Sequence, residues 1–293
     1  QSDIFYKIKI NYSNQEDLLN LSNNGVCIDH GFHKKNHFFI SDFSSDDLQK
    51  INSLGFTYDI LISDVVNFYQ NRNKSKSDIK LNEFCDSGND DYNTPENYDI
   101  KDGNDFGGFY TYDEMISELD DMYTQYPSLI SQRIDLKDNN YNATPHIHET
   151  HEGRFLQMVK ISDNPNVDED EPQILYTALH HAREPGSMQQ LIFFMWYLLE
   201  NYDSNDSIKQ IIDNSELYFV PCVNPDGYIY NEISEPSGGG MWRKNRRESH
   251  GVDNNRNYSY IDENGNEVWN TSGTSNNPNG STYAGDEPFS EAE

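Results

Sequence analysis

The feature that most constrains the fold of this chain is a stretch without hydrophobic periodicity, residues 73–105. It is rich in Asn, Asp, Ser and Gly and contains Pro95, which is typical of an exposed linker. A linker between a small module and a larger one is a natural place for proteolytic cutting. The sequence therefore predicts a small domain over residues 1–72 and a larger one over residues 106–293.

Residues 1–72 show the patterns of a compact α+β domain. Apolar residues alternate with polar ones from Ile4 to Ile10, as in a half-buried strand. Ser44-Ser45-Asp46-Asp47 is an N-cap cluster before a helical run that Gly55 closes. We expect further strands at 37–40 and 56–62, and further helices at 16–21 and after residue 63. This mixture predicts a two-layer sandwich of helices on a sheet.

Residues 106–293 resemble an α/β domain. Thr111 begins an amphipathic helix, and residues 184–202 form a long, mostly apolar helical run that should be buried. Strand-like runs cover 156–161, 174–179 and 217–223, and the last is apolar almost throughout, as in a sheet covered on both faces. After Asn224 the chain becomes rich in Gly, Asn and Ser, which predicts long irregular loops.

The charge of the chain excludes several classes of partner. Lys and Arg number 21 and Asp and Glu 50, so the net charge is −29. Nucleic-acid binding needs clustered Lys and Arg, and anionic lipid surfaces would repel this chain. The most apolar run, Leu191–Leu199, is too short to span a membrane. We therefore expect no nucleic-acid partner and no membrane span.

Three cysteines, Cys27, Cys85 and Cys222, lie far apart in the sequence. They form no CxxC pair and no zinc-knuckle spacing, so we expect no shared role. The sequence leaves open whether any of them forms a disulfide. The acidic, Asn- and Tyr-rich composition favours a secreted, extracellular protein.

The tetrapeptide His181-Ala182-Arg183-Glu184 is the first chemical motif. It lies where a predicted strand ends and a helix begins, so two side chains three residues apart can point into one small volume. Imidazole nitrogen and carboxylate oxygen suit Zn²⁺, whereas the same pattern also occurs by chance on helix surfaces. His180 is a competing ligand, but a residue still on the strand should point elsewhere.

A basic segment, Met241-Trp242-Arg243-Lys244-Asn245-Arg246-Arg247, reverses the charge of the chain locally. Guanidinium groups are the preferred partners for bidentate binding of carboxylates. A solubilising patch or salt-bridge role is the better interpretation of Lys244, Arg246 and Arg247. That interpretation fits less well for Arg243, beside a Trp, and for Arg256, within a run of Asn.

Five motifs now stand in order: His-x-x-Glu, Asn-Pro-Asp-Gly, Trp-Arg-Lys, Val-Asp-x-Asn-Arg-Asn and Thr-Tyr-x-Gly. From Thr111 to Glu293 the chain resembles the zinc metallocarboxypeptidases of the carboxypeptidase A/B/T type. The resemblance implies an α/β fold with a mixed, eight-stranded-type sheet and helices on both faces, here incomplete. Residues 1–72 and the linker resemble, less specifically, the propeptide of that family. This is a small, ferredoxin-like α+β domain that covers the cleft of the zymogen until it is cut off.

Carried over to this chain, the resemblance implies one zinc ion held by His181 and Glu184. It also implies a third zinc ligand, a general base and a mobile Tyr, all expected beyond Glu293. Two protein ligands hold Zn²⁺ poorly, so we expect this chain alone to be an inactive fragment of a peptidase.

The same resemblance implies how a substrate binds. Arg243 would polarise the scissile carbonyl, and Arg183 would help bind the substrate. Asn255 and Arg256 would hold the C-terminal carboxylate of a peptide or protein, whose last residue metal-activated water removes. A non-catalytic binding module that keeps these groups is the alternative, as is an amidase acting on cell-wall or acyl-amino-acid substrates. Side-chain preference and oligomeric state cannot be read from these residues.

Two other segments contain metal-binding residue types. Residues 163–171 carry oxygen ligands for Ca²⁺ but lack the spacing of an EF-hand, and a solvated acidic loop is the favoured alternative. His146, His148 and His151 lie near two Glu residues, and a polar loop is again the favoured interpretation.

Overall fold

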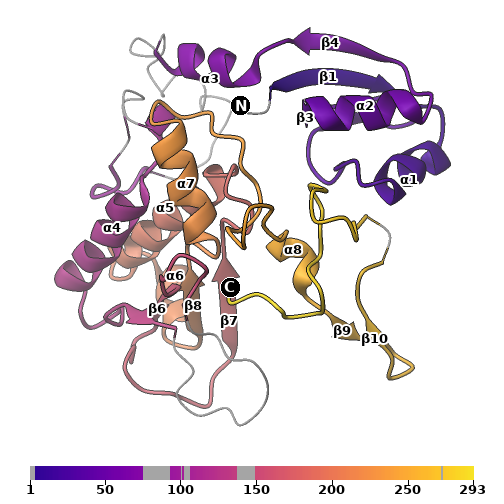
Figure 1. Ribbon diagram of the computed structural model, residues 1–293. Helices are drawn as coiled ribbons and strands as arrows, with labels where there is room; N and C mark the ends of the chain where they lie inside the picture. Colours follow the sequence, from indigo (N-terminus) through magenta and orange to yellow (C-terminus); the bar gives the residue numbers. More distant parts are fainter. Residues whose placement is uncertain (1–3, 75–92, 100, 102–105, 137–148, 272) are drawn as a thin grey trace.

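The structure is a computed structural model that describes residues 4–74, 93–99, 101, 106–136, 149–271 and 273–293. An N-terminal unit and a larger unit lie side by side, and the N-terminal unit is on the side that carries helix α8 (Figure 1). Most of the predicted linker lies outside the described residues. Within its described part, the backbone N–H groups of Glu96 and Asn97 donate to Glu200 of the larger unit.

The N-terminal unit is an α+β sandwich, as the sequence patterns predict. Its elements are β1 (Phe5–Asn11), α1 (Gln15–Asn23), β2 (Phe32–Lys34), β3 (Phe38–Ser44), α2 (Ser45–Ser53), β4 (Tyr58–Ile62) and α3 (Val65–Lys74). The antiparallel sheet has the order β2-β3-β1-β4, which together with the element order gives the ferredoxin-like arrangement. Its core contains Ile8, Ile10, Leu21, Phe43 and Ile51.

Helix starts in this unit follow directly from the sequence. The Ser44 hydroxyl accepts from the Asp47 backbone N–H, and the Asp47 carboxylate accepts in return from the Ser44 N–H, which forms a capping box. Asn14 and Asp17 do the same for α1. Strand β2 was not predicted, because its three exposed residues carry no alternation of apolar and polar side chains.

The larger unit contains a mixed sheet with the strand order β5-β6-β8-β7. Strand β6 is antiparallel to β8, and β7 is parallel to it. The elements are η2 (Phe106–Gly108), α4 (Tyr112–Gln125), β5 (Ile134–Asp135), β6 (Gln157–Ile161), β7 (Gln173–Thr177), α5 (Gly186–Asn201), α6 (Asp206–Ile212), β8 (Glu216–Val220), α7 (Pro225–Ser234), α8 (Asn254–Asn257), β9 (Tyr260–Ile261) and β10 (Glu267–Val268).

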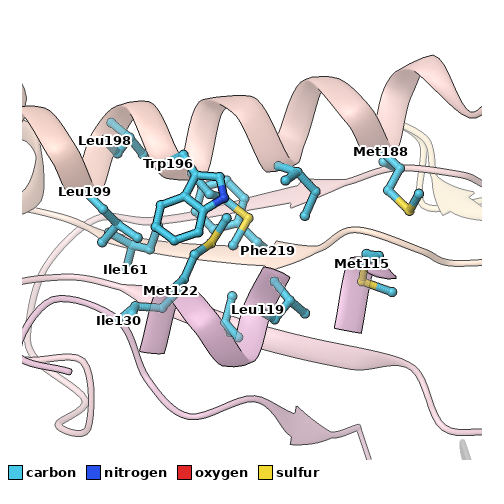
Figure 2. Packing of buried hydrophobic residues seen from close by; sticks show 14 of the residues in the cluster. Met115, Leu119, Met122, Ile130, Ile161, Met188, Trp196, Leu198, Leu199 and Phe219 are labelled. Atoms are coloured by element: carbon cyan, nitrogen blue, oxygen red, sulfur yellow. The ribbon is translucent and has the colours of Figure 1, made fainter. Parts of the chain in front are cut away.

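The main core lies where α4 and α5 pack against the sheet. Figure 2 shows Met122 of α4 and Trp196 of α5 pointing toward one another, with Phe219 of β8 beside them. The Trp196 indole N–H donates to Glu118 at 2.6 Å, so the buried ring keeps a polar partner. Strand β8 is buried, whereas β7 is an edge strand of the described sheet with Leu175 62% exposed. No helix in the described ranges has the length and apolar character that crossing a membrane requires.

One sequence prediction for this unit holds only in part. Long irregular loops were expected after Asn224, but α7 comes first and the loops begin after Ser234. The Asn224 side chain caps it by accepting from the Gly227 N–H at 2.9 Å, and Pro225 occupies the first turn. Predicted strands 174–179 and 217–223 also end earlier, at Thr177 and Val220, because the chain turns toward the site described next.

Candidate metal centre

A tight turn at the carboxyl end of β7 carries the His-x-x-Glu motif. Leu179 has a φ of 52°, a left-handed conformation that takes the chain out of the strand. Two hydrogen bonds hold the turn against the end of β8 and the residues that follow it. The Ala178 N–H donates to Val220 O at 3.1 Å, and the Asn224 N–H donates to Leu179 O at 3.0 Å. The motif thus lies at the carboxyl ends of two parallel strands, where open α/β sheets bind ligands.

The turn brings His181 and Glu184 together. His181 Nδ1 lies 3.1 Å from each carboxylate oxygen of Glu184, and the Glu184 N–H donates to His181 O at 3.1 Å. Burial by itself would lower the pKa of His181, but hydrogen bonds to Asp253 and Glu184 raise it above its usual value. His180 lies apart from this pair, with Nε2 3.1 Å from the Tyr258 hydroxyl.

Asp253 holds the other nitrogen of the imidazole. Its Oδ1 lies 3.0 Å from His181 Nε2, and its Oδ2 accepts from Arg243 Nε and Nη2 at 3.1 and 2.8 Å. Burial would raise the pKa of Asp253, but Arg243 and His181 hold it well below its usual range. Asp253 belongs to the Val-Asp-x-Asn-Arg-Asn motif, but no sequence pattern assigns it a role. Only its burial and its two partners identify it as the group that orients His181.

Arg243 is a buried cation beside the metal ligands. It is 4% exposed, and Asp253 raises its pKa although burial alone would lower it. Its Nη1 lies 3.7 Å from Glu184 Oε1 and has no hydrogen-bond partner among the described residues. A buried N–H without a partner is costly, so this donor is suited to an oxygen that a ligand brings.

These residues fit a zinc ion. The imidazole Nδ1 and the two oxygens of Glu184 converge, and they are the donor types that Zn²⁺ takes in proteins. A carboxylate on the far nitrogen of the imidazole is the usual partner of a metal-binding His. The partnerless Nη1 of Arg243 beside them supplies the positive charge that an oxyanion needs.

The N-terminal unit places a carboxylate between Arg243, the predicted catalytic residue, and Arg256, a predicted substrate-binding residue. Asp29 Oδ2 accepts from Arg243 Nη2 at 2.9 Å and from Arg256 Nη2 at 2.8 Å. Burial would raise the pKa of Asp29, but the hydrogen bond from His30 and the charge of Arg243 hold it far below its usual range. Arg243 and Arg256, which are far from the His-x-x-Glu motif in sequence, therefore meet on one carboxylate oxygen.

The two remaining predicted substrate-binding residues lie at the edge of this arrangement. Arg183 Nη2 lies 3.2 Å from His30 Nε2. Arg183, Glu184, His30 and Tyr69 are among the residues that line a cavity of about 370 Å³ between the two units. Asn255 is exposed, and its backbone N–H donates to Asp253 at 3.1 Å.

Arg246 and Arg247 have ion-pair partners, in line with the interpretation favoured from sequence, whereas Lys244 does not fit it. Arg246 stacks on Trp242, 4.5 Å from the ring centroid, and Arg247 pairs with Glu291 at 3.0 Å. Lys244 is buried rather than solubilising, and it donates to the backbone carbonyls of Pro278 and Gly280 at 2.9 Å.

Two other groups of residues were considered as metal sites, the acidic residues 163–171 and the histidines near residue 150. Ligand oxygens of Asp163, Glu169 and Glu171 all lie within 4.8 Å of one another, and the calcium hypothesis for them stays a prediction. His151 Nε2 lies 3.0 Å from Glu291, while His146 and His148 lie outside the described residues, as Cys85 does.

Comparisons with known proteins place these observations in context. Residues 130–293 match the family described as zinc carboxypeptidase. The chain is 34% identical over 158 residues to a zinc carboxypeptidase of Saccharothrix mutabilis subsp. capreolus, which covers 53% of this chain and 33% of that protein. It is 31% identical over 199 residues to carboxypeptidase B of Astacus astacus, which covers 64% of this chain and 55% of that protein. The chain thus spans about a third to about half of these two relatives.

The fold is similar to solved structures over nearly the whole chain. The carboxypeptidase A of Helicoverpa armigera matches with a TM-score of 0.67 and 18% identity, covering 99% of this chain and 64% of that one. Thrombin activatable fibrinolysis inhibitor matches with a TM-score of 0.63 and 18% identity, covering 99% of this chain and 66% of that one. At this identity the similarity concerns the fold, and it includes both units.

Proposed function

The chain belongs to the zinc carboxypeptidase family, and from this premise we propose that it carries the metal-binding and carboxylate-binding part of a zinc-dependent carboxypeptidase. The proposed reaction is hydrolysis of the C-terminal residue of a peptide or protein. The observation that carries the proposal is that Arg243 and Arg256 bind one carboxylate oxygen beside the His181–Glu184 pair. An exopeptidase has to bind a terminal carboxylate at a fixed distance from its reactive centre.

His181 and Glu184 are the proposed zinc ligands. A zinc ion there supplies a Lewis acid and an activated water for attack on a carbonyl. Asp253 contributes by fixing the His181 ring through Nε2, so that Nδ1 faces Glu184. The imidazole is thereby oriented before metal binding, which reduces the free-energy cost of organising the ligands around the ion.

Arg243 is the proposed catalytic residue of this chain. Its guanidinium group is held on one side by Asp253, while Nη1 remains available next to Glu184. A fixed, desolvated donor stabilises the negative charge that develops on a carbonyl oxygen under attack. Because two bonds to Asp253 hold the group in place, little reorganisation is needed during the reaction.

Arg256 and Asn255 are the proposed binding groups for the terminal carboxylate, and Arg183 binds the substrate from the side of the cavity. Asp29 supports the assignment of Arg256, since this internal carboxylate occupies the position that a terminal one would take. The Arg256 side chain is also fixed by donation from Nε to Gly273 O at 3.1 Å. A guanidinium held in this way presents its remaining N–H groups in one direction.

The N-terminal unit is proposed to act as a propeptide that covers the site of a zymogen. Asp29 contacts Arg243, His30 contacts Arg183, and Gln70 donates to Glu235 at 2.7 Å on the same boundary. Cutting within the linker, residues 73–105, would separate the cover from the larger unit. The proposal that the protein is secreted has its support in the acidic, Tyr- and Asn-rich composition.

The metal proposal is tested by measuring zinc binding to the chain in competition with a chromophoric chelator. The chain should bind one zinc ion fewer, or bind one zinc ion much more weakly, in His181→Ala and in Glu184→Gln. His180→Ala is the matched control and should bind zinc as the unaltered chain does, because His180 points to Tyr258. Equal zinc affinity in all these proteins would contradict the proposal.

The sequence prediction that residues 1–293 alone are inactive has its own test. His181 and Glu184 by themselves should hold Zn²⁺ too weakly to support turnover. Blocked dipeptides with a free terminal carboxylate are therefore expected to remain intact when incubated with the zinc-loaded chain. Measurable hydrolysis that depends on Arg243 would overturn the prediction of inactivity while supporting the proposed reaction.

A further inference from the structure

A second group of metal-ligand side chains lies in the N-terminal unit, in the loop between α1 and β2. Ligand atoms of Cys27, Asp29 and His30 all lie within 4.8 Å of one another. The Cys27 Sγ and His30 Nδ1 atoms are 3.8 Å apart, and each lies close to Asp29 Oδ1, at 2.7 and 2.6 Å. A thiol, an imidazole and a carboxylate are the three ligand types that zinc takes most often.

The distances between these atoms are near those that a metal requires. With bonds of about 2.3 Å to sulfur and 2.0–2.1 Å to nitrogen, two ligands of a tetrahedral zinc lie about 3.6 Å apart. The 3.8 Å between Cys27 Sγ and His30 Nδ1 matches this spacing. Asp29 Oδ1 is closer to both because it accepts hydrogen bonds from them, and a metal would take the place of these protons.

The carboxylate of Asp29 serves two sets of partners through different oxygens. Oδ2 faces the guanidinium groups of Arg243 and Arg256, while Oδ1 faces Cys27 and His30. A cation bound through Oδ1 therefore leaves both arginine contacts in place. Glu184 Oε1, 4.0 Å from His30 Nδ1, adds a carboxylate that offsets part of the positive charge of the neighbouring arginines.

Access and burial suit a binding site rather than a closed core. Cys27 is 6% exposed and lies at the bottom of the group, whereas the side chains of Asp29 and His30 are 29% and 36% exposed. An ion can therefore enter from the His30 side and meet a thiol shielded from water. Arg183, which contacts His30 Nε2, is only half-buried and can move away.

We propose that Cys27, Asp29 and His30 form a second transition-metal site, suited to Zn²⁺, in the loop that covers the centre at His181 and Glu184. Bound metal cross-links the loop and holds Asp29 on Arg243 and Arg256, so zinc strengthens the cover. This consequence for the site rests on the proposed function, whereas metal binding by the three residues does not.

Cobalt titration of the metal-free full chain separates the two sites, because only one of them contains a thiol. Thiolate ligation to Co²⁺ produces a charge-transfer band in the near ultraviolet, which imidazole and carboxylate ligands do not give. We expect this band and two Co²⁺ per chain in the unaltered protein. Cys27→Ser, which keeps the size of the side chain, should lose the band and one equivalent, and His30→Ala should weaken it strongly.

Three control variants assign each outcome. Cys85→Ser should keep the band, and so should His37→Ala, an exposed His of the same unit. His181→Ala should keep the band and lose the other equivalent. A band that is absent from the unaltered chain, or that persists in Cys27→Ser, would overturn the second site. Two equivalents retained in His181→Ala would instead count against the proposed function.

Discussion

Replacing Asp253 by Asn tests how the candidate centre is held together. Asp253 is fully buried and joins His181 to Arg243, and Asn has the same shape without the charge. Removing one partner of a buried ion pair costs about 3–5 kcal/mol. Asp29 and Glu184 remain 2.9 and 3.7 Å from Arg243, so we expect the lower end, about 3 kcal/mol.

The same substitution should weaken zinc binding. An amide holds the His181 ring less firmly than a carboxylate and makes Nδ1 a poorer ligand, which typically reduces metal affinity about 10–100-fold. The assay combines urea unfolding with zinc titration against a chelator. Both effects are expected in one variant, because Asp253 contacts the metal ligand and the guanidinium group at once.

Asp226→Asn is the matched control for this prediction. Asp226 is also fully buried, and it accepts from Arg154 Nη1 at 2.7 Å and from the Thr150 hydroxyl at 2.8 Å. Its loss should destabilise the fold without changing zinc affinity. The reasoning would be refuted if both variants lost zinc affinity by the same factor, or if Asp253→Asn bound zinc as tightly as the unaltered chain.

Two further predictions concern the scaffold around the site. Gly227→Ala should destabilise the fold by about 1–3 kcal/mol and lower its melting temperature, because an added Cβ would lie 2.6 Å from Asn224 Oδ1. Gly186→Ala is the control, because an added Cβ there meets nothing within 4 Å and should leave the melting temperature unchanged. Equal shifts in the two variants would contradict this prediction. Burial opposes ionisation of Glu216, but Lys160 at 2.6 Å lowers its pKa to about 2. The stability from this carboxylate is therefore present above pH 4.5 and lost as the pH falls toward 2. The unaltered chain should have a larger free energy of unfolding in urea than Glu216→Gln, and this difference should shrink as the pH falls across that window. A difference that stays constant with pH would refute the assignment.

The sequence was most informative where function depends on residues close together in the chain. The spacing of His181 and Glu184 predicted that they face one volume, and the two side chains do converge. Capping residues such as Thr111 and Ser44 predicted helix starts, since a cap acts within a few residues. Helix α7 was missed although Asn224-Pro225 carried the signal of an N-cap followed by Pro.

The sequence was least informative where partners are far apart in the chain. Asp253 meets His181 only because α8 folds back against the turn after β7, and no local pattern marks this contact. Asp29 reaches Arg243 and Arg256 from the other unit, across more than 200 positions. Contacts of this kind depend on how the units pack, which hydrophobic periodicity does not describe.

The most direct test of the central claim is an anomalous difference map from crystals of the chain soaked in zinc. We predict a peak bonded to His181 Nδ1 and the Glu184 carboxylate, next to the Nη1 of Arg243, whatever is found at Cys27. Zinc bound only elsewhere, such as at His151 and Glu291, with these two side chains still paired to each other, would contradict the account.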